Sequence, residues 1–259
     1  MNQQPDPDKR LPSRRIADDL RSSIESGDLP AGGKLPSERD LAARYGTARN
    51  TAREAISILQ SEGLVVAQHG RGVFVRPRMP LMRLGANRYS RRLRAETGLS
   101  PFRIEVMKQG RTPRTECRSV TKEQPPADVA DRLGLAPQTS VVRRENWYFA
   151  DDEPVQFGVT YIPVNVAGDS PLASEKTLGK GSIYARFEEL GYPITRIREE
   201  ISARMPNPEE ITGLGMPPGV PVIEVVHTSL DAQHQPFEVT RFVMRGDLNG
   251  LDYDMPVED

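Results

Sequence analysis

The chain has 259 residues and a formal net charge of −1, and a single hydrophobic core seldom grows beyond this length, so we expect two domains. The single cysteine, Cys117, excludes a secreted scaffold built on disulfides. No apolar run has the roughly 18–20 residues that cross a bilayer and the N-terminus lacks an apolar signal segment, so membrane spans and secretion are excluded and we expect a cytoplasmic protein.

Three helices are predicted near the N-terminus. Residues 1–12 are polar and contain prolines, and we expect them to form a disordered tail. Apolar residues at helical spacing predict a helix from Ser13 to Ser26. Ser37 and the aspartate three residues later have the spacing of a capping box and begin a short second helix. Thr47 is placed to cap a third helix, which runs to about Glu62.

A hairpin follows the third helix. Two β-prone runs, at 64–67 and 73–75, flank a glycine-rich tip at 68–72. Two helices, a turn at a glycine, a third helix and a hairpin follow one another in the order of a winged helix-turn-helix, which we place at residues 13–77.

The third helix has a polar face and an apolar face. At about 100° per residue, Arg49, Asn50 and Arg53 fall within one arc of about 100°, and the apolar residues centre on another arc. Arginine and asparagine are the side chains that read guanine and adenine in the major groove. Arg39, on the second helix, is placed to contact phosphate. The hairpin tip offers three candidates for the minor groove: His69, Gly70 and Arg71. The alternative is a helical hairpin with solvated arginines.

Charge favours a polyanion partner for this part of the chain. Residues 1–78 have a net charge of +3 and residues 79–118 of +7, whereas residues 119–259 have −11. A basic first half joined to an acidic second half indicates a nucleic-acid partner for the former and a different role for the latter.

The stretch GDLPAGGKLPSERDLAARYGTARNTAREAISILQSEGLVVAQHGRGVFV resembles the winged-helix domain of GntR-type bacterial transcription regulators, from about Ser13 to Val75. By this resemblance, the DNA-contact positions of the family are Ser37, Arg39, Arg49, Asn50, Arg53, His69 and Gly70. Asn50 departs from the family, in which serine or threonine is common. The resemblance also implies a homodimer that binds a short palindromic operator of double-stranded DNA.

A second domain follows the prolines at 76–80. We expect a linker at 78–98, with a basic helix at 83–97, and an effector domain at 99–259. Strands are expected at 102–108, 115–121, 141–149, 155–161, 197–205, 221–230 and 236–245, and helices at 126–133, 182–190 and 207–213. Strands joined by short turns pair antiparallel, so this is an α+β pattern.

Four segments of the second domain resemble the UTRA domain of the HutC-like subfamily: GRTPRTE, FADDEPVQFGVTYIP, GSIYARFEELGYPI and GLGMPPGVPVIEVVHTSLDAQHQPFEVTRFVMRGD. The likeness covers about residues 90–250. It implies a chorismate-lyase-like antiparallel sheet that binds a small-molecule effector rather than converting it.

Alternation along the strands predicts which side chains share a face: Arg144, Asn146 and Tyr148; Gln156, Gly158 and Thr160; Glu238, Thr240, Phe242 and Met244. The resemblance implies pocket positions at Asn146, Tyr148, Gly158, Ser182, Glu238 and Met244, with Tyr89 and Ser90 from the linker.

The pocket departs from phosphosugar-sensing relatives. These carry arginines where this chain has Asn146 and Tyr148, and arginine pairs grip anions. We also expect Gly158 and Met244 to widen the pocket and make it less polar. The effector is therefore predicted to be less anionic and more amphipathic, with Arg144 as a remaining candidate cation.

Other chemistry is sparse. The sequence lacks a catalytic or metal-binding motif, so we expect no cofactor and no metal. The acidic pairs Glu199-Glu200 and Glu209-Glu210 are expected to lie at solvated edges. We predict a repressor that its effector releases. The alternatives are a ligand-independent repressor of the plasmid or developmental type with a vestigial pocket, and an enzyme that retains lyase chemistry.

Overall fold

The structure is a computed structural model that describes residues 11–76, 81–174, 176–180 and 182–254. It divides into two compact units, one N-terminal up to Met79 and a larger one that contains most of the chain from Pro80 onward. Of the disordered tail expected at 1–12, residues 1–10 lie outside the described residues. Pro12, its last residue, is the first residue of a helix.

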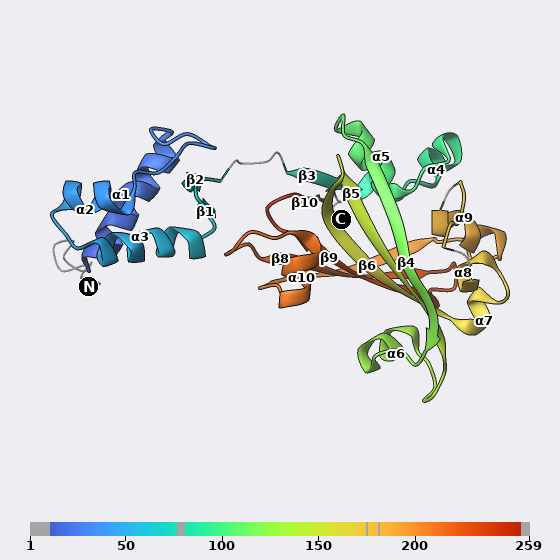
Figure 1. Ribbon diagram of the computed structural model, residues 1–259. Helices are drawn as coiled ribbons and strands as arrows, with labels where there is room; N and C mark the ends of the chain where they lie inside the picture. The colour runs from blue at the N-terminus through green and yellow to red at the C-terminus, as the bar shows by residue number, and fades with distance from the viewer. Residues whose placement is uncertain (1–10, 77–80, 175, 181, 255–259) are drawn as a thin grey trace, which may run out of the picture. The chain divides into compact units, whose positions relative to one another are not determined.

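The N-terminal unit consists of α1 (Pro12–Ser26), α2 (Glu38–Tyr45), α3 (Arg49–Ser61) and a hairpin of β1 (Val65–Gln68) and β2 (Gly72–Val75), shown in Figure 1. Its core gathers one apolar stripe from each helix and the inward residues of the hairpin: Ile16, Leu20, Leu41, Ala52, Ile56, Leu59, Val65 and Val75. The predicted order of helices and hairpin is confirmed.

The caps of α2 and α3 differ from the expectation. The Ser37 hydroxyl accepts the Asp40 backbone N–H at 3.2 Å and donates to the Asp40 carboxylate at 2.7 Å, so half of the capping box is present. Ala48, not Thr47, occupies the N-cap of α3 and offers no side-chain cap. The Thr47 N–H instead donates to the Ala42 carbonyl at 3.0 Å and closes the end of α2.

The larger unit is built on one antiparallel sheet. Its strand order is β4 (Pro113–Glu123), β5 (Val141–Ala150), β6 (Glu153–Pro163), β9 (Pro236–Arg245), β8 (Val222–Leu230) and β7 (Arg196–Arg204). This confirms the α+β class with an antiparallel sheet.

Helices cover both faces of this sheet (Figure 1). On one face α6 (Ala127–Leu133) packs in a core with Val141 and Val239, and α10 (Pro208–Leu214) lies against Trp147 through Gly213. The other face carries four helices: α5 (Pro101–Lys108), α7 (Val164–Ala167), α8 (Pro171–Ser174) and α9 (Ser182–Glu189).

The chain enters the larger unit through residues 82–97, which we call the connector. It comprises β3 (Met82–Gly85), a 3-10 turn at Ala86–Tyr89 and α4 (Arg91–Thr97). The expectation of one helix at 83–97 is therefore wrong. Met82 and Leu84 alternate toward the core at 1% and 3% exposed, and β3 pairs in parallel with β10 (Asn249–Asp252).

The strand expected at 102–108 is also wrong, because this segment forms α5. Ser100 caps the helix with its hydroxyl and Pro101 occupies the first turn, where its missing N–H costs nothing. Phe102 and Val106 lie one turn apart and share the same core. The apolar alternation that suggested a strand is a coincidence of a short helix buried on more than one side.

Candidate nucleic-acid interface and ligand cavity

The exposed face of α3 presents the predicted reading residues. Arg49, Asn50 and Arg53 all lie on the solvent side, whereas Ala52 and Leu59 on the opposite side are 0% exposed. Arg39 extends from α2 with 76% of its side chain exposed. A rigid helix that projects two guanidiniums and an amide from one face fits the width of a major groove.

Arg53 is not free on this face. Its Nε and Nη2 each donate to Glu38 of α2 at 2.9 Å, in a two-pronged ion pair. The hydrogen bond from Arg53 lowers the pKa of the Glu38 carboxyl, and the charge of Arg49 adds to this effect. Sequence patterning missed Glu38, which holds the Arg53 fork in one orientation and competes with any base or phosphate for it.

The tip of the β1–β2 hairpin is open to solvent. His69, Gly70 and Arg71 are exposed, and Gly70 has a left-handed backbone with φ of +71°. The Arg71 N–H donates to the Gln68 carbonyl at 3.0 Å, and its guanidinium lies 5.8 Å from the centre of the Phe74 ring. The turn therefore places the side chains of His69 and Arg71 on either side of a glycine, which has no Cβ to obstruct entry into a groove.

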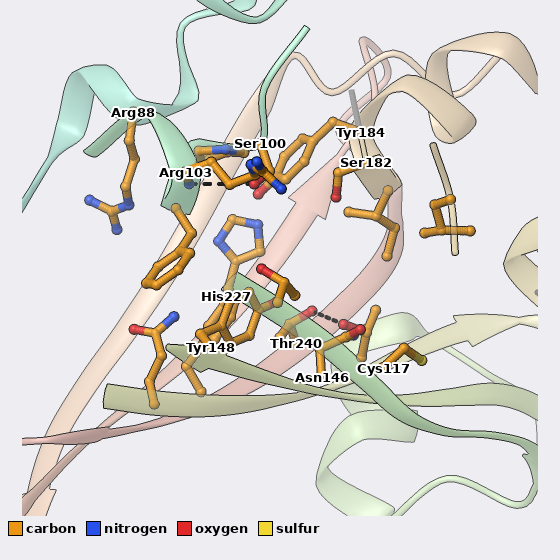
Figure 2. A pocket seen from close by; sticks show the side chains of 18 of the residues that line it. Arg88, Ser100, Arg103, Cys117, Asn146, Tyr148, Ser182, Tyr184, His227 and Thr240 are labelled. Atoms are coloured by element: carbon orange, nitrogen blue, oxygen red, sulfur yellow. Dashed lines mark hydrogen bonds between the residues drawn. The ribbon is translucent and has the colours of Figure 1, made fainter. Parts of the chain in front are cut away.

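A cavity of about 450 Å³ lies on the α5 and α9 side of the sheet. Figure 2 shows Ser182 and Tyr184 of α9 across the cavity from Asn146 and Tyr148 of the sheet, with His227 between them. Several sequence-predicted residues line it together: Tyr89, Asn146, Tyr148, Gln156, Thr160, Ser182, Glu238, Thr240, Phe242 and Met244. Its volume is typical of small-molecule sites.

The polar floor of the cavity centres on Glu238, whose side chain is 5% exposed. Its carboxylate accepts hydrogen bonds from Ser229 at 2.6 Å and from Thr240. Thr240 in turn lies 2.7 Å from the Thr160 hydroxyl. The Gln156 amide oxygen is buried and has no hydrogen-bond partner in the described part of the chain. A ligand that offers hydroxyl or amide hydrogens would find acceptors here.

An aromatic wall faces this floor. The Tyr148 ring packs edge-on against Phe102 at 5.0 Å between centres and lies 6.1 Å from Phe242. Burial raises the pKa of the Tyr148 phenol, so it stays a neutral hydrogen-bond donor. The cavity thus combines an apolar side with a polar floor.

Gly158 does not line the cavity, contrary to the sequence expectation. A Cβ at this position would lie 2.8 Å from two carbons of the Phe242 ring and 3.3 Å from the Thr240 methyl. The space that the missing side chain leaves is therefore filled by Phe242, which pairs with Gly158 across β6 and β9. The glycine does not widen the cavity.

Arg144 and Ser90 also lie outside the cavity lining. Arg144 is 0% exposed, and its guanidinium donates to the backbone carbonyls of Pro171 at 3.3 Å and Leu172 at 2.7 Å in α8. Burial lowers its pKa. It therefore supports α8 rather than offering a cation to a ligand. The Ser90 hydroxyl accepts the Leu93 N–H and caps α4.

Some lining residues were not predicted: Arg88, Ser100, Phe102, Arg103, Cys117, Tyr184 and His227. His227 pairs with Thr240 in the sheet register, so strand alternation carried to β8 would have placed it on the cavity face. The residues of α5, which include Arg103, were hidden by the incorrect strand assignment.

Only one member of each acidic pair is solvated as expected: Glu200 and Glu209 are open to solvent, whereas Glu199 and Glu210 are buried. The side chain of Glu199 is 7% exposed and forms an ion pair with Arg88 at 3.0 Å. Glu210 is 7% exposed as well, completes a capping box with Asn207 and bonds to Arg204 at 2.7 Å. Each sits on a strand or helix face that a neighbouring element covers.

No helix in residues 11–76, 81–174, 176–180 and 182–254 is long and apolar enough to cross a bilayer. Over the same residues, His, Cys, Asp and Glu side chains form no group of three that could hold a metal ion.

Comparison with known proteins places both units. Residues 12–75 match the family of bacterial regulatory proteins named gntR, and residues 108–248 match the UTRA domain. The chain is 29% identical over 235 residues to the HTH-type transcriptional repressor NagR of Bacillus subtilis, with 90% of each chain covered. It is 30% identical over 250 residues to the HTH-type transcriptional regulator SCO4628 of Streptomyces coelicolor, covering 95% and 93%. A crystal structure described as a GntR-family transcriptional regulator superposes with a TM-score of 0.71 at 26% identity, covering 96% and 99%.

Proposed function

Because the chain belongs to the GntR family of transcription regulators and carries a UTRA domain, we propose that it is a homodimeric repressor released from a short palindromic operator by a small molecule in the cavity. The chain is a DNA-binding regulator and not an enzyme. What supports repression is the name of the relative NagR, which is called a repressor. A two-fold dimer would present two α3 helices to two half-sites.

The exposed face of α3 carries this proposal. Arg49 and Asn50 project from a helix whose other side is anchored in the core, so their positions are set before DNA arrives. Preorganised side chains of these two types suit guanine and adenine edges. Arg39 and the hairpin tip lie on flanking elements, where phosphate and minor-groove contacts are expected.

The cavity supports an effector that is less anionic than a phosphosugar and more amphipathic. Of the basic residues that line it, Arg88 is already paired with Glu199, whereas Arg103 and Lys176 lie at the wall; the carboxylate of Glu238 at its floor repels anions. The amide oxygen of Gln156, which has no hydrogen-bond partner among the described residues, and the hydroxyls of the floor favour a ligand with several hydrogen-bond donors. The rings of Tyr148 and Phe242 favour an apolar portion.

The first test is selection of bound duplexes from a random DNA pool at two salt concentrations. A short palindrome whose affinity falls steeply with salt supports a dimeric reader that neutralises phosphates. If the selection enriches no sequence, the proposal for the operator is overturned.

The second test concerns the effector. Uncharged polyols and their phosphorylated counterparts are screened by thermal shift, because a ligand that binds the folded state raises its apparent stability. Stabilisation by uncharged compounds that also release the selected duplex supports the proposal. An open cavity in which the Gln156 oxygen lacks a partner among the described residues argues against a ligand-independent repressor. If no compound shifts the unfolding temperature, that alternative becomes the better account.

A further inference from the structure

A buried carboxylate holds the connector on the sheet. Glu199 of β7 accepts two hydrogen bonds from Arg88, at 3.0 and 3.1 Å, and one from the Tyr89 hydroxyl at 2.5 Å. The Tyr253 hydroxyl donates to its other oxygen. Burial alone would raise the pKa of Glu199, but the hydrogen bond from His227, the charge of Arg88 and the two phenols lower it to about 2. The group is therefore an anion at neutral pH.

The connector is held on a second side by Arg94 of α4. Its guanidinium donates to the Tyr89 carbonyl at 2.6 Å and to Glu188 of α9 at 3.1 Å, and lies 4.8 Å from the centre of the Tyr184 ring. Tyr89 lines the cavity, with its ring 5.2 Å from that of His227. The part of the connector that a ligand can touch therefore lies between two arginine anchors.

Hydrogen bonds join Glu199 to the floor of the cavity. His227 is 2% exposed, with Nδ1 3.3 Å from Glu199 and Nε2 3.2 Å from the Ser229 hydroxyl. The single hydroxyl hydrogen of Ser229 is donated to Glu238, so Nε2 of His227 donates to the Ser229 oxygen, and Nδ1 must also carry a hydrogen in order to donate to the Glu199 carboxylate. The path joins the two carboxylates through His227 and Ser229, and donation runs outward from His227 toward Glu199 on one side and toward Glu238 on the other.

We propose that this path transmits occupancy of the cavity to the connector, with Glu199 and His227 as positioning residues. A ligand hydroxyl that bonds to Glu238 competes with Ser229, and the change reaches Glu199 through His227. Arg88 and Tyr89 then lose part of their anchor, and the connector loosens. The inference rests on the proposed function, because it describes how the cavity would act on the segment that leads from the first unit. Such coupling is reciprocal, so anything that fixes the connector also alters the cavity.

The sequence offers a matched control for the test. Glu200, the next residue of β7, also accepts two bonds from one arginine, Arg132, each at 3.0 Å, but on the other face of the sheet. Amide hydrogen exchange is measured on the full chain and on Glu199→Gln and Glu200→Gln. We expect exchange at residues 82–97 to accelerate by about tenfold or more in Glu199→Gln and by less than about twofold in Glu200→Gln. Equal effects, or equal acceleration throughout the larger unit, would overturn the proposal.

The link through Ser229 is tested separately. Glu238→Gln weakens the acceptor at the floor and should change exchange in the connector, but not in a Ser229→Ala background, where the path is already cut. If the Glu238→Gln effect persists unchanged in that background, the path does not carry the coupling. Tyr89→Phe removes one hydroxyl and leaves no charge unpaired, so it replaces Glu199→Gln if that variant does not fold. These measurements use neither DNA nor ligand, and their failure is therefore distinct from failure to select an operator.

Discussion

Lowering the pH from 7 to 3 should remove about 2 kcal/mol of stability from the larger unit through Glu199 alone. The pKa of this carboxyl is about 2 in the folded chain and 4.5 ordinarily. Because the folded value is the lower one, the stabilisation is complete above about pH 5.5 and is lost as the pH falls toward 2. The full difference corresponds to roughly 3 kcal/mol, at about 1.4 kcal/mol for each pH unit.

The assay uses the only tryptophan of the chain. Trp147 lies in β5, is 6% exposed and stacks on Phe157 with 5.0 Å between ring centres, so its fluorescence reports unfolding of the larger unit. Urea unfolding is measured at pH 7 and pH 3 for the wild type and for Glu199→Gln. The glutamine does not titrate, so the variant should lose about 2 kcal/mol less than the wild type between the two pH values.

A control and a refuting result complete this prediction. Glu200 also has a lowered pKa, through its hydrogen bond from Arg132, but 37% of its side chain is exposed and the solvent screens the pair. Glu200→Gln should therefore follow the wild type to within about 0.5 kcal/mol. If Glu199→Gln and the wild type lose the same stability between pH 7 and pH 3, the burial and hydrogen bonds described for Glu199 do not act as argued.

Three further predictions concern the reading face and the sheet. Arg49→Ala should lose about 1–3 kcal/mol of base discrimination, whereas Arg39→Ala should weaken binding to all DNA sequences evenly. Competition between the selected operator and its single-base variants checks both, and an unchanged sequence preference in Arg49→Ala would contradict the docking of α3 in the major groove. Glu38→Gln should free Arg53 and steepen the dependence of log affinity on log salt by up to about one unit, which a salt titration measures. Gly158→Ala should cost about 1–3 kcal/mol in urea unfolding, since its Cβ would overlap the neighbouring ring; an unchanged midpoint would show that the ring moves freely.

Most of the fold could be predicted from periodicity because most elements have one buried face. The stripe of Ile16 and Leu20 in α1, for example, reports the one core that this helix faces. Periodicity failed where an element is covered on several sides. In α5, Phe102 and Val106 face the sheet core while Ile104 is also buried, so the helix displays the alternation of a strand.

The site was predicted only where strand alternation is enough. Asn146, Tyr148 and Thr240 share the cavity face because alternate residues of a strand point to the same side of the sheet. Parity could not show that α8 covers Arg144, because this depends on a helix that lies elsewhere in the sequence. It also could not show that Glu199 meets Arg88, since that pair joins β7 to the connector across more than a hundred residues.

The parallel pairing of β3 with β10 affects the order in which the two units can fold during synthesis. Met82 pairs with Asn249, and Gly85 with Asp252, so the strand that begins the connector lacks this partner until residues 249–252 have left the ribosome. The N-terminal unit has its own core and can fold while the rest of the chain is still being made. Nascent chains would therefore hold a folded helix-turn-helix before β10 exists, and loss of β10 would leave a DNA reader whose connector keeps its two arginine anchors but has lost its strand pairing.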